Sequence, residues 1–242
     1  MSDAAQLRIA GISRFSSVDW PGKLVATLFL QGCPWDCFYC HNPELISPRR
    51  AGRISWQSVH DFLETRKGLL DGVVFSGGEP TMQRALIPAL QQARALGFAV
   101  GLHSGGAYPA LLTDALPLID WIGLDIKARR DDYSDTTGRT RSGDNAWRSL
   151  DTVVAASRAR SGTAHPLDYE VRTTVHPGVL DAMALSSLAD DVAKAGADTW
   201  MLQHYRPIGV RAARIPAATA PYDLESAAAG LGTGRFQRFG IR

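Results

Sequence analysis

Short apolar runs alternate along the chain with longer segments in which apolar side chains recur every three or four residues. The short runs predict β-strands, and the longer periodic segments predict helices. Strands are expected at 24–30, 73–75, 98–103, 121–126, 169–175 and 200–205. Helices are expected from Ser55 onward and over 84–96, 108–116, 145–158 and 181–195. Such an alternation is typical of parallel β-α-β units.

The two faces of the expected strands differ in polarity. Along 121–127, one face carries only isoleucine and leucine, whereas Asp125 and Lys127 lie on the other. Arg172 and His176 share one face of the next strand. A sheet covered by helices on both faces has strands that are apolar nearly throughout. The pattern therefore favours an α/β fold built as a partial (β/α)6 TIM-like barrel of parallel strands, with a polar interior, over an open doubly wound sheet.

Nothing in the sequence divides the chain of 242 residues, which has no internal repeat, low-complexity block or linker rich in proline and serine. We expect one domain over 1–242, with an N-terminal lead-in at 1–22 and a C-terminal extension at 216–242. The extension is expected to form an alanine-rich helix from Leu224 and then a short basic end.

Charge and hydropathy exclude two classes of partner. A formal net charge of +2 produces no strong field of one sign, so neither nucleic acid nor a membrane surface is expected to bind. The amino terminus lacks the basic and apolar regions of a signal peptide, and the nearest apolar run is too short to cross a bilayer. A cytoplasmic location is expected.

The cysteines of the chain are Cys33, Cys37 and Cys40. A disulfide between two of them would leave an odd thiol, and a reducing cytosol disfavours any disulfide. Thiolates are good ligands for iron–sulfur clusters and for zinc. A 4Fe–4S cluster usually takes one cysteine for each iron, so three cysteines would leave one iron open to a ligand from outside the protein.

The cysteines alone leave three other interpretations open. The stretch from Cys37 to His41 matches the attachment pattern of c-type haem, although it leaves Cys33 unused and haem attachment normally accompanies export. Zinc bound by three cysteines and His41 is a common structural site. The cysteines could also be buried and free, but their close spacing argues against that interpretation.

A second motif, Ser76-Gly77-Gly78-Glu79-Pro80, follows directly after the strand expected at 73–75. Two glycines let the backbone approach a ligand closely, and Glu79 can pair with an ammonium group. Alone, the motif could be a tight turn. Together with the cysteines it indicates a ligand site, because both motifs follow the carboxyl ends of strands, where barrel enzymes place their active sites.

The spacing Cys33-x-x-x-Cys37-x-x-Cys40, with Tyr39 before the last cysteine, resembles the radical S-adenosylmethionine (SAM) superfamily. The glycine-rich segment resembles the methionine-binding motif of that superfamily. The resemblance implies that the three cysteines are catalytic metal ligands of a 4Fe–4S cluster. It also implies SAM as a cofactor, cleaved reductively to methionine and a 5′-deoxyadenosyl radical. The implied cofactor-binding residues are Tyr39, Gly77, Gly78, Glu79, Asp125, Lys127, Arg172 and His176.

A further layer of resemblance concerns the substrate. Asp19-Trp20-Pro21-Gly22 and Cys40-His41-Asn42-Pro43 resemble the activating enzymes of glycyl radical enzymes. The segment from Gly11 to Gly22 looks most like the activating proteins of anaerobic ribonucleoside-triphosphate reductase. The implied partners are a glycyl radical enzyme, whose glycine loses a hydrogen atom, and an electron donor of the flavodoxin or ferredoxin type. A radical enzyme that acts on a small molecule is the alternative.

Other polar residues gain roles only through this resemblance. Asp125-Ile126-Lys127 resembles an Asp-x-Lys segment that lies near the cofactor in these activators, although a local salt bridge explains the pair equally well. Arg172 and His176 are similar to part of a segment that lies over the cofactor, and an arginine fork suits a carboxylate. For His176, as for His204, a structural hydrogen bond is an equal alternative.

The chain departs from the activators of the pyruvate formate-lyase type in two places. Asp19-Trp20-Pro21-Gly22 stands where those proteins usually have Asp-Gly-Pro-Gly. His103-Ser104-Gly105-Gly106 replaces a segment whose aspartate helps to bind a monovalent cation, so the resemblance does not extend to that cation site. Because there are no further cysteines, an inserted ferredoxin-like domain is not expected.

Overall fold

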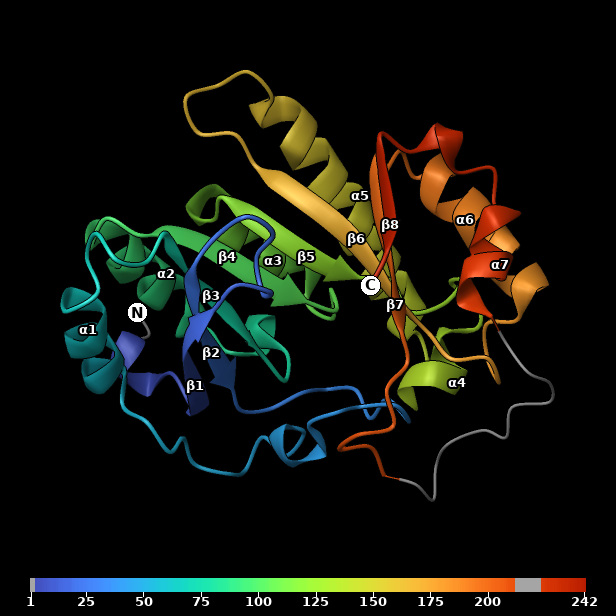
Figure 1. Ribbon diagram of the computed structural model, residues 1–242. Coiled ribbons are helices and arrows are strands. Elements are labelled where there is room, and N and C mark those ends of the chain that lie inside the picture. Colours follow the sequence, from blue (N-terminus) through green and yellow to red (C-terminus); the bar gives the residue numbers. More distant parts are fainter. Residues whose placement is uncertain (1–2, 212–222) are drawn as a thin grey trace.

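In the part of the chain that the structure describes, eight strands form one sheet, and their order in space follows their order in the sequence (Figure 1). The computed structural model describes residues 3–211 and 223–242. β1 is antiparallel to β2, and each later pair of neighbours is parallel. The strands are β1 (Ile9–Ser16), β2 (Val25–Leu30), β3 (Gly72–Gly77), β4 (Ala99–Ser104), β5 (Trp121–Asp125), β6 (Asp168–Val175), β7 (Thr199–His204) and β8 (Arg238–Ile241).

Helices connect the parallel strands and cover one face of the sheet (Figure 1). Ser55 begins the first helix as expected, because its hydroxyl accepts a hydrogen bond of 3.1 Å from the backbone N–H of Ser58. The helices are α1 (Trp56–Glu64), α2 (Leu86–Ala95), α3 (Pro109–Ala115), α4 (Tyr133–Thr137), α5 (Ser142–Arg160), α6 (Ala182–Lys194) and α7 (Leu224–Ala229). Short 3-10 turns include η2 (Pro43–Leu45) and η3 (Pro80–Met82).

The larger of two buried clusters lies between the sheet and its helices. Phe75 of β3 and Leu102 of β4 face this layer, and Leu86 and Leu90 of α2 pack there as well. All four side chains are fully buried. Burying a side chain of this size typically contributes about 1.5–3 kcal/mol, so this layer holds the helices on the sheet.

The smaller cluster closes one end of the barrel interior. The rings of Trp20 and Trp121 stack with their centroids 5.5 Å apart, and Val74 packs in the same cluster. Gly101 of β4 leaves room for them, because a Cβ atom there would lie 2.8 Å from the ring of Trp20. Trp121 is the first residue of β5. The cluster therefore fills the interior near the amino ends of the strands, and the carboxyl ends stay available for a site.

The expected α/β fold with a partial barrel of parallel strands is confirmed. The expected strands are β2 to β7, each correct to within two residues at either end. The two outer strands, β1 and β8, are not paired with each other in the described part of the chain, which leaves the barrel open along one side. None of the described helices is long and apolar enough to cross a membrane.

Both ends of the chain differ from expectation. β1 lies within the expected lead-in, where the sequence predicted no strand. The helix expected from Leu224 ends at Ala229, and the expected basic end forms β8 instead. Arg238 and Arg242 at this end form ion pairs with acidic residues of β6. These contacts could not be predicted from the short C-terminal segment alone, because β6 is distant in the sequence. Residues 1–2 of the lead-in and 212–222, which include the start of the extension, lie outside the described residues.

Candidate active site

A cavity of about 670 Å³ lies at the carboxyl ends of the parallel strands. It brings together every candidate residue except His176. The candidates that line it are Cys33, Cys37, Tyr39, Cys40, Gly77, Gly78, Glu79, Asp125, Lys127 and Arg172. Residues from β2 through β6, far apart in the sequence, thus converge as parallel strands of a barrel require.

The three cysteines lie on the loop that follows β2, and all three thiols are free. Hydrogen bonds to neighbouring segments fix this loop at several points. The backbone N–H of Cys33 donates to the carbonyl of Ile46 at 3.0 Å, and that of Cys40 donates to the carbonyl of Cys37 at 3.1 Å. Cys37 is buried, whereas the other two cysteines are partly exposed to the cavity.

Burial raises the pKa of both Cys33 and Cys37, which disfavours their thiolates, and one nearby cation opposes this effect. The pKa of the Cys37 thiol is raised to about 11, and the opposing charge is that of Lys127. The Lys127 ammonium also lies 5.7 Å from the centre of the Tyr39 ring. The hydroxyl of Tyr39 is buried and has no hydrogen-bond partner among the described residues. Three soft donors, one cation and one unpartnered hydroxyl therefore fit a 4Fe–4S cluster with one iron open to another ligand.

Two glycines after β3 allow the second loop to press against the first. Gly77 has a φ of +109°, and a Cβ atom there would lie 2.2 Å from the backbone nitrogen of Leu30. A Cβ atom on Gly78 would lie 2.3 Å from the carbonyl oxygen of Gly32. That the glycines admit a ligand stays a prediction, and both line the cavity. The atoms nearest to their added Cβ atoms belong to the end of β2 and to Gly32, at the start of the cysteine loop. The small size of both glycines therefore sets the spacing between the two loops.

The carboxylate of Glu79 is almost fully buried and joins its own loop to the end of β4. Oε1 accepts hydrogen bonds from the backbone N–H and hydroxyl of Thr81, at 3.0 and 2.6 Å, and from the hydroxyl of Ser104 at 2.9 Å. Oε2 accepts one from the backbone N–H of Gly105 at 2.8 Å. Burial raises the pKa of Glu79, and these four donors oppose the rise. Because each oxygen has about two lone pairs, Oε2 retains the capacity for one more donor.

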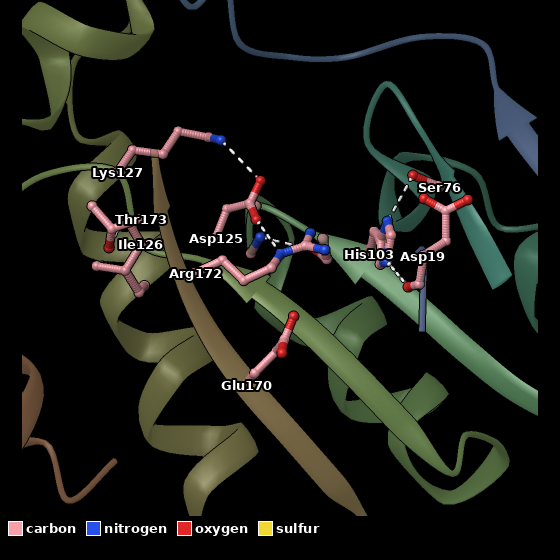
Figure 2. A network of polar contacts seen from close by, with 12 residues as sticks. Asp19, Ser76, His103, Asp125, Ile126, Lys127, Glu170, Arg172 and Thr173 are labelled. Atoms are coloured by element: carbon pink, nitrogen blue, oxygen red, sulfur yellow. Dashed lines mark hydrogen bonds and ion pairs between the residues drawn. The ribbon is translucent and has the colours of Figure 1, made fainter. Parts of the chain in front are cut away.

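Asp125 holds two cations on the polar face of the barrel (Figure 2). Its Oδ1 accepts a hydrogen bond from Arg172 Nε at 2.8 Å, and its Oδ2 pairs with Lys127 Nζ at 3.1 Å. These cations hold the pKa of Asp125 far below its usual range, despite burial. Gly123 makes room for the arginine, since a Cβ atom there would lie 2.7 Å from its guanidinium carbon. The local salt bridge that the sequence allowed is present, and it lines the cavity.

His103 is a site residue to which the sequence assigned no role. Its Nε2 lies 2.7 Å from the carbonyl oxygen of Asp19, and its Nδ1 lies 3.0 Å from the hydroxyl of Ser76 (Figure 2). A carbonyl oxygen only accepts, so Nε2 carries the hydrogen and Nδ1 accepts from Ser76. Burial, with a smaller effect from Arg172, lowers the pKa of His103 to about 3. The imidazole is therefore neutral, and the unusual segment that begins at His103 was the signal that could have indicated it.

His176 is the candidate that the structure does not bring to the cavity. Its ring packs edge-on against Phe38, with centroids 5.1 Å apart, and against Tyr205 at 4.5 Å. Its Nδ1 accepts a hydrogen bond of 3.1 Å from the backbone N–H of Gly178, and burial lowers its pKa. Because Phe38 lies between two cysteine ligands of the candidate cluster, His176 supports the cysteine loop from behind. The cavity is also lined by residues that the sequence did not single out for it, including Val18, Asp19, Thr174, Gln203, Arg206 and Arg242.

The fold and the site together define the class of protein, a partial-barrel enzyme with a thiolate-rich cofactor cavity at the carboxyl ends of its strands. The sequence model of the radical SAM superfamily matches residues 27–188, which include both motifs. The chain belongs to the radical SAM superfamily. Enzymes of this superfamily use a 4Fe–4S cluster and SAM, and these are therefore the cofactors of the chain.

Several relatives are named as activating enzymes. A protein of Methanocaldococcus jannaschii, named provisionally as a glycyl-radical enzyme activating enzyme, is 28% identical over 204 residues, which cover 82% of this chain and 80% of that protein. The pyruvate formate-lyase-activating enzyme of Clostridium pasteurianum is 32% identical over 142 residues, covering 56% of this chain and 59% of that enzyme. The 7-carboxy-7-deazaguanine synthase of Thermococcus kodakarensis is 29% identical over 116 residues, covering 40% of this chain and 46% of that enzyme.

Solved structures share the fold at lower sequence identity. QueE from Escherichia coli superimposes with a TM-score of 0.55 and 15% identity, over 98% of this chain and 94% of that chain. A domain of the pyruvate-formate lyase-activating enzyme from Bacteroides vulgatus gives a TM-score of 0.51 and 17% identity, over 71% of this chain and 98% of that chain. At such identities the likeness establishes the fold alone.

Proposed function

We propose that this chain activates a glycyl radical enzyme by removing a hydrogen atom from one glycine of that partner. The observation that carries the proposal is the similarity to the M. jannaschii protein along 82% of the chain. Pyruvate formate-lyase-activating enzymes resemble shorter parts of this chain. The segment from Gly11 to Gly22 favours an anaerobic ribonucleoside-triphosphate reductase as the partner. The chain would act as a single domain, in the reducing cytoplasm where free thiols persist.

The residues of the cavity divide between the two cofactors. Cys33, Cys37 and Cys40 would hold the cluster and leave one iron to the amino and carboxylate groups of SAM. The chemistry that the cofactors supply when bound is one-electron cleavage of the SAM sulfonium, which gives methionine and a 5′-deoxyadenosyl radical. Lys127 places a positive charge near Cys37, and this charge favours the thiolate that a metal requires.

The remaining candidates would orient SAM. Oε2 of Glu79 would accept a hydrogen bond from its ammonium group, while the other bonds of that carboxylate keep the loop rigid. The guanidinium of Arg172 is held at Nε by Asp125, which fixes the plane in which it can bind a carboxylate. Asp125 holds Lys127 by its other oxygen, so one carboxylate sets the positions of both cations.

The open side of the barrel supports a protein substrate. Residues from both sides of the opening line the cavity, with Val18 following β1 and Arg242 following β8. Val18 is 79% exposed beside the cavity, where a partner could cover it. An extended loop that carries a glycine could therefore reach the cavity through this side, between the two edge strands.

The second candidate function is radical chemistry on a small molecule. It is favoured by the similarity of 116 residues to a 7-carboxy-7-deazaguanine synthase. A small-molecule enzyme would direct the radical to that molecule, whereas an activating enzyme would mark a partner protein with a radical. The two functions differ in where the radical is found.

Electron paramagnetic resonance on the reconstituted enzyme tests the proposal. The enzyme is incubated anaerobically with SAM, dithionite and the glycyl radical enzymes of the same organism, including any anaerobic ribonucleotide reductase. A stable carbon-centred radical on one partner, whose hydrogen splitting is lost when its glycine is deuterated at the α-carbon, is the expected result. SAM cleavage without a radical on any of these partners would contradict the proposal and favour a small-molecule substrate.

A further inference from the structure

A second cavity, of about 370 Å³, adjoins the cysteine loop. Part of its lining is apolar, from Ala10 of β1, Phe29 of β2 and Leu45 of η2. His41 and Asn42 line both this cavity and the cofactor cavity, and they follow Cys40 directly in the chain. A molecule seated in the second cavity would thus lie against the two residues next to a proposed cluster ligand.

Two arginines line this cavity. Arg50 and Arg53 line it and share a single carboxylate, that of Glu44, at 3.6 and 3.8 Å. Their side chains are 56% and 74% exposed, so these ion pairs are weak and strongly solvated. Arg8 donates a hydrogen bond of 2.8 Å to the carbonyl of Pro48, which places another guanidinium beside this segment.

With the exposed Arg49, these residues form what we call the arginine rim, defined as Arg8, Arg49, Arg50 and Arg53. Four arginines against one glutamate leave a local charge of +3, compared with +2 for the whole chain. The charges of the rest of the chain nearly cancel, and the rim produces a local positive field in the segment that follows the cysteine loop. Such a field attracts large anionic surfaces and speeds their association.

The wall of the second cavity is firmly joined to the cysteine loop. The side-chain amide of Gln31 donates hydrogen bonds to the carbonyls of Glu44 and Ser47, at 3.0 and 2.9 Å. The backbone N–H of Gly32 donates to the carbonyl of Leu45 at 2.7 Å. A partner bound on this wall would hold a fixed position relative to the thiols, as efficient electron transfer requires.

We infer that the second cavity and its arginine rim dock an acidic protein that donates one electron to the cluster site. The donor is oxidised by one electron, and the cluster on the cysteine loop is reduced by one. Apolar contacts in the cavity would anchor the donor, and its carboxylates would face the rim. Exposed arginines spread over a segment suit the surface of an acidic protein. A small anion would instead be held by buried hydrogen-bond donors. The inference rests on the cluster that the proposed function requires, and not on the identity of the substrate.

The test compares a protein donor with a small reductant. The double variant Arg50→Ala/Arg53→Ala is prepared beside the control Lys23→Ala/Lys67→Ala, whose lysines are exposed and precede the amino ends of β2 and β3. Binding of a purified acidic flavodoxin is measured by titration at low and high salt. Formation of 5′-deoxyadenosine from SAM is then driven either by reduced flavodoxin or by dithionite.

We expect the arginine variant to bind flavodoxin about tenfold more weakly at low salt, with a smaller difference at high salt. The rate with flavodoxin should fall in parallel, whereas the rate with dithionite and both rates of the lysine control should match the wild type. Glu44→Gln removes the opposing charge from the rim and should strengthen flavodoxin binding.

Flavodoxin binding that equals the wild type in the arginine variant would overturn the inference. An equal loss of rate with dithionite would also overturn it, because the variant would then damage the site itself. Loss of the glycyl radical alone, with dithionite as reductant, would assign the surface to the protein substrate. Failure of the proposed function appears differently, as the absence of a glycyl radical in the wild type with either reductant.

Discussion

Asp125 and Arg172 face each other on the neighbouring strands β5 and β6, and Arg172 Nε donates a hydrogen bond of 2.8 Å to Asp125 Oδ1. The second oxygen of the same carboxylate pairs with Lys127 at 3.1 Å. One anion therefore separates two cations on the wall of the cofactor cavity. Its removal would leave two positive charges close together with no anion between them.

Asp125→Asn should lower the free energy of unfolding by about 2 kcal/mol, less than for a wholly buried pair because the carboxylate is partly open to the cavity. Chemical denaturation measures the change. The control is Asp144→Asn, which removes the carboxylate of an exposed pair with Arg141 at 3.7 Å and should leave stability nearly unchanged. Equal effects of the two substitutions would contradict the central role of Asp125.

His103 should make stability depend on pH in the acid range. The unfolded chain binds a proton on this histidine near pH 6.5, whereas burial lowers the pKa in the folded chain to about 3. Between these values the unfolded state binds more protons, so stability falls as the pH falls, by up to about 1.4 kcal/mol per pH unit.

His103→Gln removes this titration. Denaturation of wild type and variant between about pH 6 and pH 4 should show a steeper loss for the wild type, and the difference should approach that slope. The carboxylates common to both proteins cancel in this comparison. Parallel pH profiles would show that His103 is protonated in the folded chain, against the tautomer that its two hydrogen bonds indicate.

The close approach of Gly77 to Leu30 predicts that an added methyl group will lower the free energy of unfolding strongly. Gly77→Ala places a Cβ atom 2.2 Å from the backbone of Leu30, at a φ of +109°, so strain adds to a steric clash. We expect a loss of about 3 kcal/mol. Gly68→Ala is the matched control, because its φ is +75° and nothing lies within 4 Å of the added atom. It should cost about 1 kcal/mol, from backbone strain alone; similar losses for both would show that the loops are not tightly packed.

The hydrogen bonds of Glu79 predict that glutamine, which has nearly the same shape, cannot replace it without lowering stability. Glu79→Gln directs an NH2 group toward a donor, either the N–H of Gly105 or the donors at Oε1, and should cost about 1–3 kcal/mol. Ser104→Ala removes one donor to Oε1 and also the acceptor of the Gly106 N–H, so it should likewise cost about 1–3 kcal/mol. Equilibrium binding of SAM, measured on the cluster-loaded protein, should weaken more in the glutamine variant. If the alanine variant proves the more damaging one, the hydroxyl matters more than the carboxylate.

Much of this architecture follows from local sequence patterns. Alternation of apolar runs and helical periodicity located β2 to β7, because each strand buries one face under a helix. The cysteine spacing and the glycine motif indicated the cofactor site, since both are short segments whose chemistry does not depend on distant contacts. Lys127 lies two residues beyond Asp125, the last residue of β5, and period-two alternation was enough to predict that the two share a wall.

The rest depends on contacts between distant segments. The bond between His103 and the carbonyl of Asp19 joins positions 84 residues apart, and no periodicity encodes it. β8 is four residues long and pairs only because the barrel presents an open edge beside β7. His176 shares a strand face with Arg172 by alternation, yet it lies beyond the last residue of β6 and turns toward Phe38 instead of the cavity.

The central claim is that the three cysteines hold a cluster that supports SAM cleavage. The most direct measurement is anaerobic reconstitution with iron and sulfide, followed by dithionite and SAM, with 5′-deoxyadenosine quantified by chromatography. We predict that the wild type forms this product and that Cys37→Ala, matched by native circular dichroism, forms none. A reconstituted wild type that binds zinc or haem, shows no cluster absorbance and forms no 5′-deoxyadenosine would contradict the account.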